Sequence, residues 1–467
     1  MLFNSLEFIE LLLITFCIYY LPKLSKLQVP ILILSSLIFY AYGQPVLLLL
    51  LLCSASVNIA MSYLIVNAPA YRKFYATLGV TINLGILVYF KYAPLFANTF
   101  LDTEHGIGHF LLTIPLPIGI SFYTFEGISI LVDVYSNKHK DTLTIDHSLS
   151  RHISKTLFFI SFFPHLIAGP ILKAYQFYPQ IGSKQFKNID WEYAFKKLTM
   201  GYFLKMVVAD NLANFTFWMA APHFQLKSSL TLIVMLLGYS FQIFADFAGY
   251  SLIALGLAKL FGYDLMENFN FPYISTSFSE FWRRWHISLS TFLKEYLYIP
   301  LGGNRKGNVR TYLNLTITMV LGGLWHGAAW SYAVWGAFHG LALAIERFIE
   351  QNFRIKIKLT GGKVLKGLMV FSFVTLAWLL FKLPFDQVLL YLKTIYTNRA
   401  LQNEYVLIIC ILLYSLPVVV YHLLYLFPPD WKFRMMLQRY QPIGYGFLLL
   451  MITVNSGPSG SFIYFQF

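Results

Sequence analysis

GGLWHGAAW, residues 322–330, places a single histidine among glycine, alanine, leucine and tryptophan residues. The stretch lies within a run from Thr311 to Ile345 that contains no Asp, Glu, Lys or Arg. Runs of more than about 18 apolar residues are typical of helices that cross a bilayer. The run therefore places His326 at membrane depth, where a polar group is expensive unless it has a partner or a function.

The composition of the whole chain predicts an all-α polytopic membrane protein. Of its 467 residues, 57% are hydrophobic and 12% are charged, a balance that no soluble globular protein needs. The net charge of +14 comes from basic residues in short loops, which favours anionic lipid or an anionic ligand over nucleic acid. The cysteines lie in apolar segments without a CxxC or a Cys/His cluster, so we expect neither disulfides nor a metal site.

Apolar runs separated by short polar loops set the predicted topology. We predict membrane spans near residues 5–22, 28–43, 45–66, 73–97, 111–134, 198–220, 229–258, 312–326, 328–346, 364–383, 405–427 and 441–455. Residues 156–172 and 269–300 are apolar but interrupted by prolines or charges, which predicts re-entrant helices. The positive-inside rule then places both termini outside, although the basic loop 382–404 fits this topology poorly.

Four histidines lie within apolar or re-entrant sequence: His165, His286, His326 and His339. For His326 two interpretations are equally open. A buried imidazole can bind a backbone carbonyl and pack two helices together. A neutral imidazole in an apolar site can also act as a general base.

Two basic stretches are candidates for binding an anion. In FWRRWHISL, residues 281–289, Arg283 and Arg284 lie between tryptophans, as in an interfacial aromatic belt or an anion-binding site. The Gly-rich LGGNRKGNVR, residues 301–310, is either a tight cytoplasmic turn or, through Asn304 and Arg305, the approach for a phosphate-bearing donor.

Two further side chains are candidate functional groups. Asp246 is the only charged residue between 229 and 258, and we favour a structural role in which it pairs with Arg283 or Arg284. The chain ends GPSGSFIYFQF, where Tyr464 is either part of an aromatic plug or a hydroxyl delivered into a cavity. A GxSxG elbow is absent, so no serine nucleophile of that type is expected.

Several of these stretches together resemble the membrane-bound O-acyltransferase (MBOAT) family. The resemblance spans roughly residues 115–345 and is carried by FFPHLIAGPI (162–171), ADFAGYSLIALGLAKLFGYDLMENFNFPY (245–273), FWRRWHISLSTFLKEYLYIPLGGNRKG (281–307) and LGGLWHGAAW (321–330). The LGGNRKG and FIYFQF elements resemble the bacterial branch that O-acetylates polysaccharides such as alginate and peptidoglycan. Glu126 departs from this pattern, because glutamine is expected there.

The resemblance implies one integral membrane domain over residues 1–467, with a C-terminal helix and tail at 441–467. It implies a ring of tilted helices, with re-entrant helices, around a tunnel that crosses the membrane of a bacterium, here the cytoplasmic (inner) membrane. His326 matches the family's catalytic histidine and His286 its second site histidine. The implied donor is acetyl-coenzyme A, with no bound cofactor, and the implied partner is an extracytoplasmic SGNH-type esterase-like protein.

We assign substrate binding to the polar and aromatic residues around these motifs: Arg283, Arg284, Trp325, Asn304, Arg305 and Asp246. We further hypothesise that Tyr464 accepts the acyl group and relays it. A phenol has a pKa near 10 and is a better leaving group than an alkyl alcohol.

Three alternatives remain open on the sequence. The chain could transfer D-alanine from a carrier protein to a wall polymer. It could be a transporter that uses Asp246, Glu126 and His326 along its path, although inverted repeats are absent. It could also be a scaffold that anchors a secreted enzyme.

Overall fold

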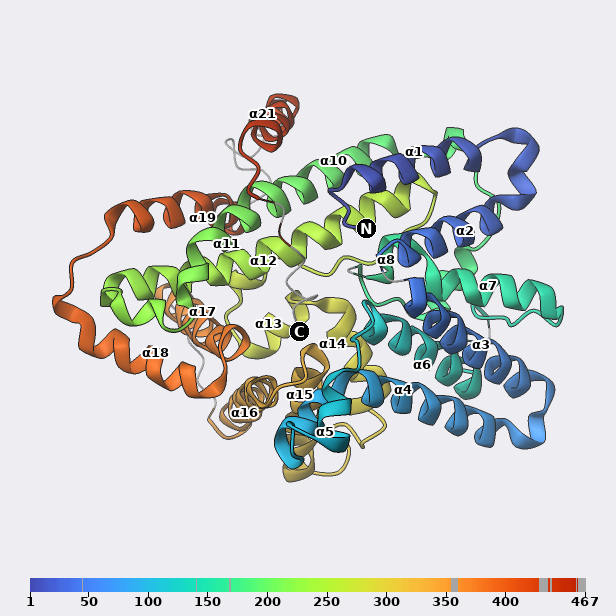
Figure 1. Cartoon of the computed structure of the whole chain (residues 1–467), viewed down its shortest axis with the longest axis horizontal. Helices are drawn as coiled ribbons and strands as arrows, with labels where there is room; N and C mark the ends of the chain where they lie inside the picture. Colours follow the sequence, from blue (N-terminus) through green and yellow to red (C-terminus); the bar gives the residue numbers. More distant parts are fainter. Residues whose placement is uncertain are drawn as a thin grey trace. The chain divides into compact units, whose positions relative to one another are not determined.

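The computed structural model describes residues 1–43, 45–139, 141–167, 169–353, 360–427, 436, 439–458 and 460. Every regular element among these residues is a helix, as the composition predicts (Figure 1). Within the described part, six helices are long and apolar enough to cross a membrane. The protein is therefore an all-α polytopic membrane protein.

The chain forms two compact units. The first comprises Met1–Leu198 and Ile253–Met266, and the second comprises Thr199–Leu252 and Glu267–Phe467. Two helices, α10 (Trp191–Tyr202) and α12 (Ser229–Leu260), contribute residues to both units. The assignment of one domain to the whole chain stays a prediction.

The first unit is built from helices that pack on their sequence neighbours. Its remaining α-helices are α1 (Leu6–Tyr19), α2 (Gln28–Ala41), α3 (Pro45–Asn67), α4 (Arg72–Phe100), α5 (Gly106–Leu112), α6 (Ile120–Ser136), α7 (Leu149–Ser161), α8 (Phe163–Leu166) and α9 (Ala174–Phe177). Helices α3, α4 and α6 pack pairwise on one another (Figure 1). Buried Asn58 on α3 and Asn83 on α4 exchange side-chain hydrogen bonds of 3.1 and 2.9 Å, which satisfies both amides in an apolar interior.

The second unit carries the motif-rich sequence. Its remaining α-helices are α11 (Asp210–Thr216), α13 (Phe278–Arg284), α14 (Ile287–Leu293), α15 (Asn308–His326), α16 (Trp330–Asn352), α17 (Thr360–Lys382), α18 (Phe385–Thr397), α19 (Tyr405–Tyr425) and α21 (Gln441–Val454). π-Helical turns occur at Phe203–Ala209 and Lys294–Tyr298. Such turns are rare in proteins and are frequent at functional sites.

Two details of the predicted topology were wrong. The predicted span 111–134 is interrupted, because α5 ends at Leu112 and α6 begins only at Ile120. Pro115, Pro117 and the left-handed Gly119 occupy the break. The predicted loop 382–404 is largely helical, since α18 occupies Phe385–Thr397.

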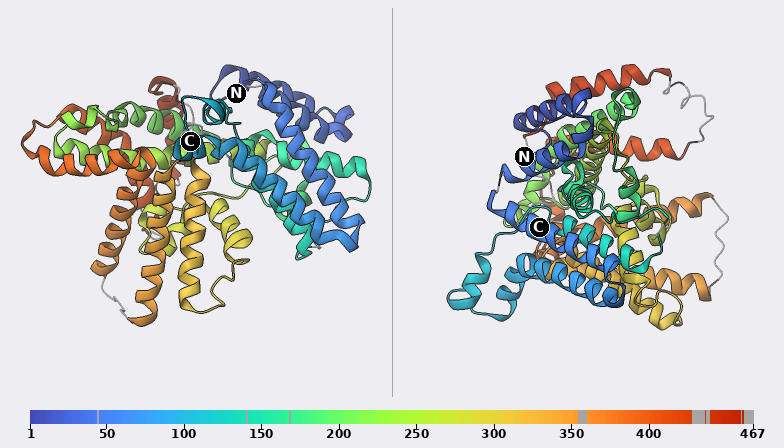
Figure 2. Two further views of the ribbon diagram at one scale, coloured as in Figure 1. Left: turned by 60° about the horizontal axis from the view of Figure 1, so that its bottom comes forward. Right: turned by 90° about the vertical axis from the view of Figure 1, so that its right-hand side faces the viewer.

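The predicted break between two helices at Gly327 is confirmed. Helix α15 ends at His326 and α16 begins at Trp330, and the two pack closely along their length (Figure 2). Glycines permit this approach. A Cβ on Gly336 would lie 2.2 Å from the Met319 carbonyl oxygen, and one on Gly323 would lie 2.1 Å from that of Tyr332. The hairpin therefore holds His326 at the closed end of two tightly packed helices.

This packing predicts that Gly336→Ala destabilises the protein, because the new methyl meets backbone that a side-chain rotation cannot move. Overpacking of this kind costs about 1–3 kcal/mol. Gly85→Ala is the matched control, since a Cβ there meets nothing within 4 Å and both changes gain the same helix propensity. Thermal unfolding in detergent should show Gly336→Ala melting below Gly85→Ala. Equal melting temperatures would contradict the close packing.

Candidate active site

His286 occupies a strained turn between two short helices. Its backbone is in the left-handed region, with φ of 42° and ψ of 57°, which side chains other than glycine rarely adopt. Asn268 holds the turn, because its carbonyl accepts from the Ile287 N–H at 2.9 Å and its side chain accepts from the Ser288 N–H at 3.2 Å. The Asn268 amide in turn donates to the Ser251 hydroxyl at 3.1 Å. The turn thus aims a buried imidazole inward.

His326 lies close to His286, as the sequence predicted for a shared site. The two ring centroids are 6.1 Å apart, and both side chains are buried. The Trp325 ring lies 5.2 Å from His326 and 5.9 Å from His286. A small group between the imidazoles could therefore contact both of them.

Aromatic rings enclose this histidine pair. Trp335 on α16 and Phe381 on α17 each lie 5.3 Å from His326, and Phe247 on α12 lies 4.5 Å from His286. Such an enclosure lowers the local dielectric constant and strengthens polar interactions inside it. His339, another buried histidine of this unit, lies 4.8 Å from Trp335 and belongs to the same aromatic cluster.

The same unit contains a cavity of about 610 Å³, within the size range of small-molecule sites, whose described lining includes neither His286 nor His326. We call it the cationic pocket, because four basic residues line it: Arg283, Lys294, Arg305 and Arg347. No acidic residue is among the described residues that line it. Its wall includes Ile287, the neighbour of His286, and Met319, two turns before His326 on α15. The pocket thus joins a positively charged surface to the residues that flank the histidines.

The predicted anion-binding residues separate into two groups in the structure. Arg283, Asn304 and Arg305 line the cationic pocket, whereas Arg284 does not. Arg284 binds the Glu280 carboxylate and the Asn270 carbonyl, each at 3.0 Å. Its contacts therefore connect α13 to the loop before it.

Sequence reasoning missed Lys294 and Arg347 as members of this site. Helical-hairpin geometry could have identified Arg347. Arg347 follows Gly327 by the same number of residues as Gly307, in the basic turn 301–310, precedes it. Two antiparallel helices joined at Gly327 bring these positions to the same level. No comparable signal marks Lys294, which the π-helical turn at Lys294–Tyr298 carries into the pocket lining.

The predicted partner of Asp246 was wrong. Asp246 pairs with Lys205, which lies in the π-helical turn at Phe203–Ala209, and not with Arg283 or Arg284. The Lys205 ammonium lies 2.7 Å from an oxygen of Asp246 and 2.7 Å from an oxygen of Asp210. All three side chains are buried. No local sequence pattern indicates this pairing, because Lys205 and Asp246 are far apart along the chain.

Glu126 has a clear partner within the first unit. Its carboxylate lies 2.9 Å from Nδ1 of His165, and both side chains are fully buried. His165 belongs to the FFPHLIAGPI motif, and Phe162 and Phe177 pack against its ring. The glutamate at this position therefore forms a buried polar pair with a motif histidine.

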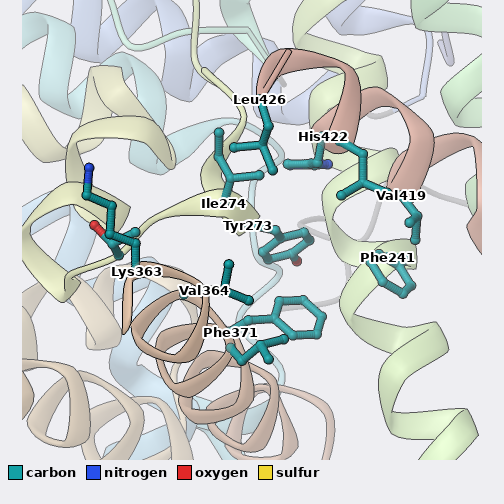
Figure 3. A pocket seen from close by; sticks show the side chains of 13 residues that line it. Phe241, Tyr273, Ile274, Lys363, Val364, Phe371, Val419, His422 and Leu426 are labelled. Atoms are coloured by element: carbon teal, nitrogen blue, oxygen red, sulfur yellow. The ribbon is translucent and has the colours of Figure 1, made fainter. Parts of the chain in front are cut away.

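A second cavity, the apolar pocket, has a volume of about 430 Å³ and contains neither site histidine. Figure 3 shows Phe241, Tyr273 and Phe371 along it, with Lys363 at one side. Its lining is mostly apolar but includes His422, whose Nδ1 donates to the Val418 carbonyl at 2.8 Å. Tyr464, the remaining predicted site residue, lies outside the described residues.

Comparison with known proteins agrees with this arrangement of motifs. The MBOAT, membrane-bound O-acyltransferase, family model matches residues 109–385, more than half of the chain. The chain belongs to this family. It is an O-acyltransferase, which removes the transporter and scaffold alternatives.

Curated relatives fall into two groups. The chain is 39% identical over 392 residues to the probable alginate O-acetylase AlgI of Pseudomonas aeruginosa, covering 82% of this chain and 72% of the relative. It is 37% identical over 383 residues to the peptidoglycan O-acetyltransferase of Helicobacter pylori, covering 75% and 70%. Similarity to the teichoic acid D-alanyltransferase of Bacillus subtilis is lower, at 29% over 247 residues, covering 50% and 60%.

The Glu126–His165 pair predicts different outcomes for two substitutions. In Glu126→Gln the amide oxygen can still accept from the His165 ring, so stability should change little. In Glu126→Ala the buried imidazole loses its partner, which should lower stability by about 1–3 kcal/mol. Exposed Glu104→Ala serves as the control. Thermal unfolding of the three variants tests this, and equal destabilisation by Gln and Ala would contradict the pairing.

Proposed function

We propose that this O-acyltransferase takes an acetyl group from acetyl-coenzyme A at the cytoplasmic face and passes it across the membrane for O-acetylation of an exported polysaccharide. The observation that carries the proposal is the cationic pocket, whose wall includes Ile287, the residue directly after the buried His286. The similarity to an alginate O-acetylase and to a peptidoglycan O-acetyltransferase supports the acetyl group and the class of polymer.

The charges of the cationic pocket suit the donor. Coenzyme A carries several phosphates, and arginine binds phosphate through paired hydrogen bonds. Arg283, Arg305 and Arg347 supply such groups, and Lys294 adds a fourth positive charge. With its phosphates held there, the pantetheine arm would extend past Ile287 toward His286 and His326. We place the approach on the cytoplasmic side, because the basic turn 301–310 follows the positive-inside rule.

The histidine pair suits the acyl-transfer step. In this mechanism His326 takes the proton of an acceptor hydroxyl, and the hydroxyl oxygen attacks the thioester carbonyl carbon. The carbon–sulfur bond then breaks, and the coenzyme A sulfur leaves with the proton that His326 received. His286 lies close enough to contact the same thioester group and orient it. General-base help of this kind contributes about 10²–10⁴-fold in rate.

Tyr464 is the acceptor hydroxyl in this proposal. Its acetyl ester would form with the donor that enters from the cytoplasmic face. The ester would then react on the extracytoplasmic face with a serine of an SGNH-type partner. The partner would then acetylate the polymer. This scheme requires a bacterial cytoplasmic membrane with the C-terminus outside, as the charge distribution predicts.

The proposal predicts that labelled acetyl-coenzyme A leaves its acetyl group on Tyr464. His326→Ala should lower the rate of labelling by about 10²–10⁴-fold, and Tyr464→Phe should abolish labelling of the C-terminal peptide. Peptide mass spectrometry of the purified protein in liposomes measures both. Coenzyme A release without label on Tyr464 would overturn the relay.

The same experiment separates the acetyl proposal from D-alanyl transfer. A D-alanyltransferase would use a thioester on a carrier protein and would leave acetyl-coenzyme A unchanged. Turnover of a carrier-bound D-alanyl thioester, with none of acetyl-coenzyme A, would replace the proposed donor.

The cationic pocket predicts a selective loss of donor binding in Arg347→Ala and Arg283→Ala. Loss of a hydrogen bond to a charged group costs about 1.5–3 kcal/mol, or roughly 10-fold or more in affinity. Because the arginines contact the donor and not the reacting carbonyl, KM should rise while kcat changes little. Arg310→Ala, an exposed arginine outside the pocket, is the matched control. An unchanged KM in both pocket variants would place the donor elsewhere.

A further inference from the structure

The proposed reaction leaves a buried ion cluster unused. Lys205, Asp210 and Asp246 lie in the second unit, and one ammonium contacts two carboxylates at 2.7 Å each. With all three groups ionised, the cluster keeps one excess negative charge. A buried excess charge is expensive unless hydrogen-bond donors surround it.

The backbone around this cluster is unusual. Lys205 lies in the π-helical turn Phe203–Ala209, and Asp210 begins α11 directly after it. A π-helical turn leaves backbone carbonyls displaced from the regular helical hydrogen-bond pattern. One such carbonyl, that of Met206, accepts a hydrogen bond from outside the helix.

That outside donor is the C-terminal tail. The Gly457 N–H donates to the Met206 carbonyl at 2.8 Å. Two residues earlier, the Asn455 carbonyl accepts from the Asn211 amide at 3.0 Å, and the Asn455 side chain accepts from the Tyr414 hydroxyl at 3.0 Å. The tail therefore leaves α21 along a path fixed by contacts with the π-helical turn Phe203–Ala209, with α11 and with α19.

Gly457 is the closest point of approach. A Cβ there would lie 2.7 Å from the Asn211 nitrogen and 2.7 Å from the Asp210 carbonyl carbon, both backbone atoms. The position therefore accepts only glycine without a shift of the tail or of α11. By contrast, Gly446 on the preceding helix α21 has nothing within 4 Å of its Cβ position.

The cluster and the tail also complement each other in charge. The Gly460 N–H donates to the carboxylate of Asp210, one of the two carboxylates that share the Lys205 ammonium. A backbone N–H directed at a buried carboxylate stabilises it. The tail thus supplies a donor that the ion cluster needs.

We propose that the Lys205–Asp210–Asp246 cluster and its π-helical turn form a seat for the tail residues Asn455, Gly457 and Gly460, and that this seat positions Tyr464 for acyl transfer. The second half of this inference rests on the proposed relay. Four residues separate Gly460 from Tyr464, and an extended chain spans at most about 3.3–3.6 Å per residue. A seat that holds Gly460 would therefore limit the reach of the Tyr464 hydroxyl by the length of this four-residue link, about 14 Å of backbone.

Gly457→Val tests the seat in the full-length protein, with Gly446→Val as the matched control. Hydrogen–deuterium exchange in nanodiscs should show protected amides at Asn455, Gly457 and Gly460 in the native chain and in Gly446→Val. In Gly457→Val their protection should fall by at least about 10-fold, while α21 stays protected. With acetyl-coenzyme A, Gly457→Val should lose about 10²-fold in kcat, the expected effect of misplacing a reacting group, with KM unchanged within about two-fold.

Asp210→Asn provides a second variant if Gly457→Val does not fold. It removes the excess charge with little change of shape, so the exchange of Gly460 should rise while α11 stays folded.

The outcomes separate the seat from the relay. Unprotected amides at Asn455, Gly457 and Gly460 in the native protein would overturn the seat. Loss of protection in Gly457→Val with native turnover would show that the seat does not position the reacting group. If Tyr464→Phe keeps full activity, the proposed relay fails, while the exchange data still decide whether the seat exists.

Discussion

A polar group in an apolar interior must have a partner, and this requirement shapes the site and its surroundings. Several of the buried polar side chains described above have a charged or hydrogen-bonding partner. Glu126 is paired with His165, Lys205 holds two carboxylates, and Asn268 clamps the turn that carries His286. Unsatisfied, groups of this kind would cost roughly 1–3 kcal/mol each, and more if charged. Some of these buried polar side chains therefore also hold the backbone in place, as Asn268 does at the turn that carries His286.

Backbone geometry in turn decides what the histidines can reach. The glycines of α15 and α16 bring these helices into close contact and place His326 at the end of the hairpin. The left-handed turn at His286 brings a second imidazole toward it from another element. Neither position is set by helix propensity. Close helix packing places His326, and hydrogen bonds to the turn place His286. A strained backbone such as that of His286 persists in a native structure only when its surroundings hold it in this way.

The fold class and most helices could be predicted from the sequence, because long apolar runs carry a strong signal. The break at Gly327 could also be predicted, although no charged loop marks it. The interruption at Pro115–Gly119 was missed because its flanking residues are as apolar as a span. Helix α18 was missed because its charged residues suggested a loop.

The candidate site was predictable only in part. Motif resemblance pointed to His286 and His326, whereas the basic, Trp- and Gly-rich pattern of the two stretches suggested Arg283, Asn304 and Arg305. Ion pairs between residues far apart in the sequence could not be predicted. Any of several basic residues could have been the partner of Asp246, and the local sequence does not distinguish among them. Lys205 became identifiable only when the π-helical turn brought it to Asp246 and Asp210. Tertiary packing, not local pattern, made that choice.

The central claim is that a thioester donor held in the cationic pocket reaches the histidine pair. The most direct measurement is a cryo-electron microscopy structure of the protein with a non-hydrolysable thioether analogue of acetyl-coenzyme A. The account predicts phosphate density against Arg283 and Arg347, and the acetyl carbon beside His326 with room for a hydroxyl at the near-attack distance of about 3–3.5 Å. Analogue density elsewhere, with the cationic pocket left open, would contradict it.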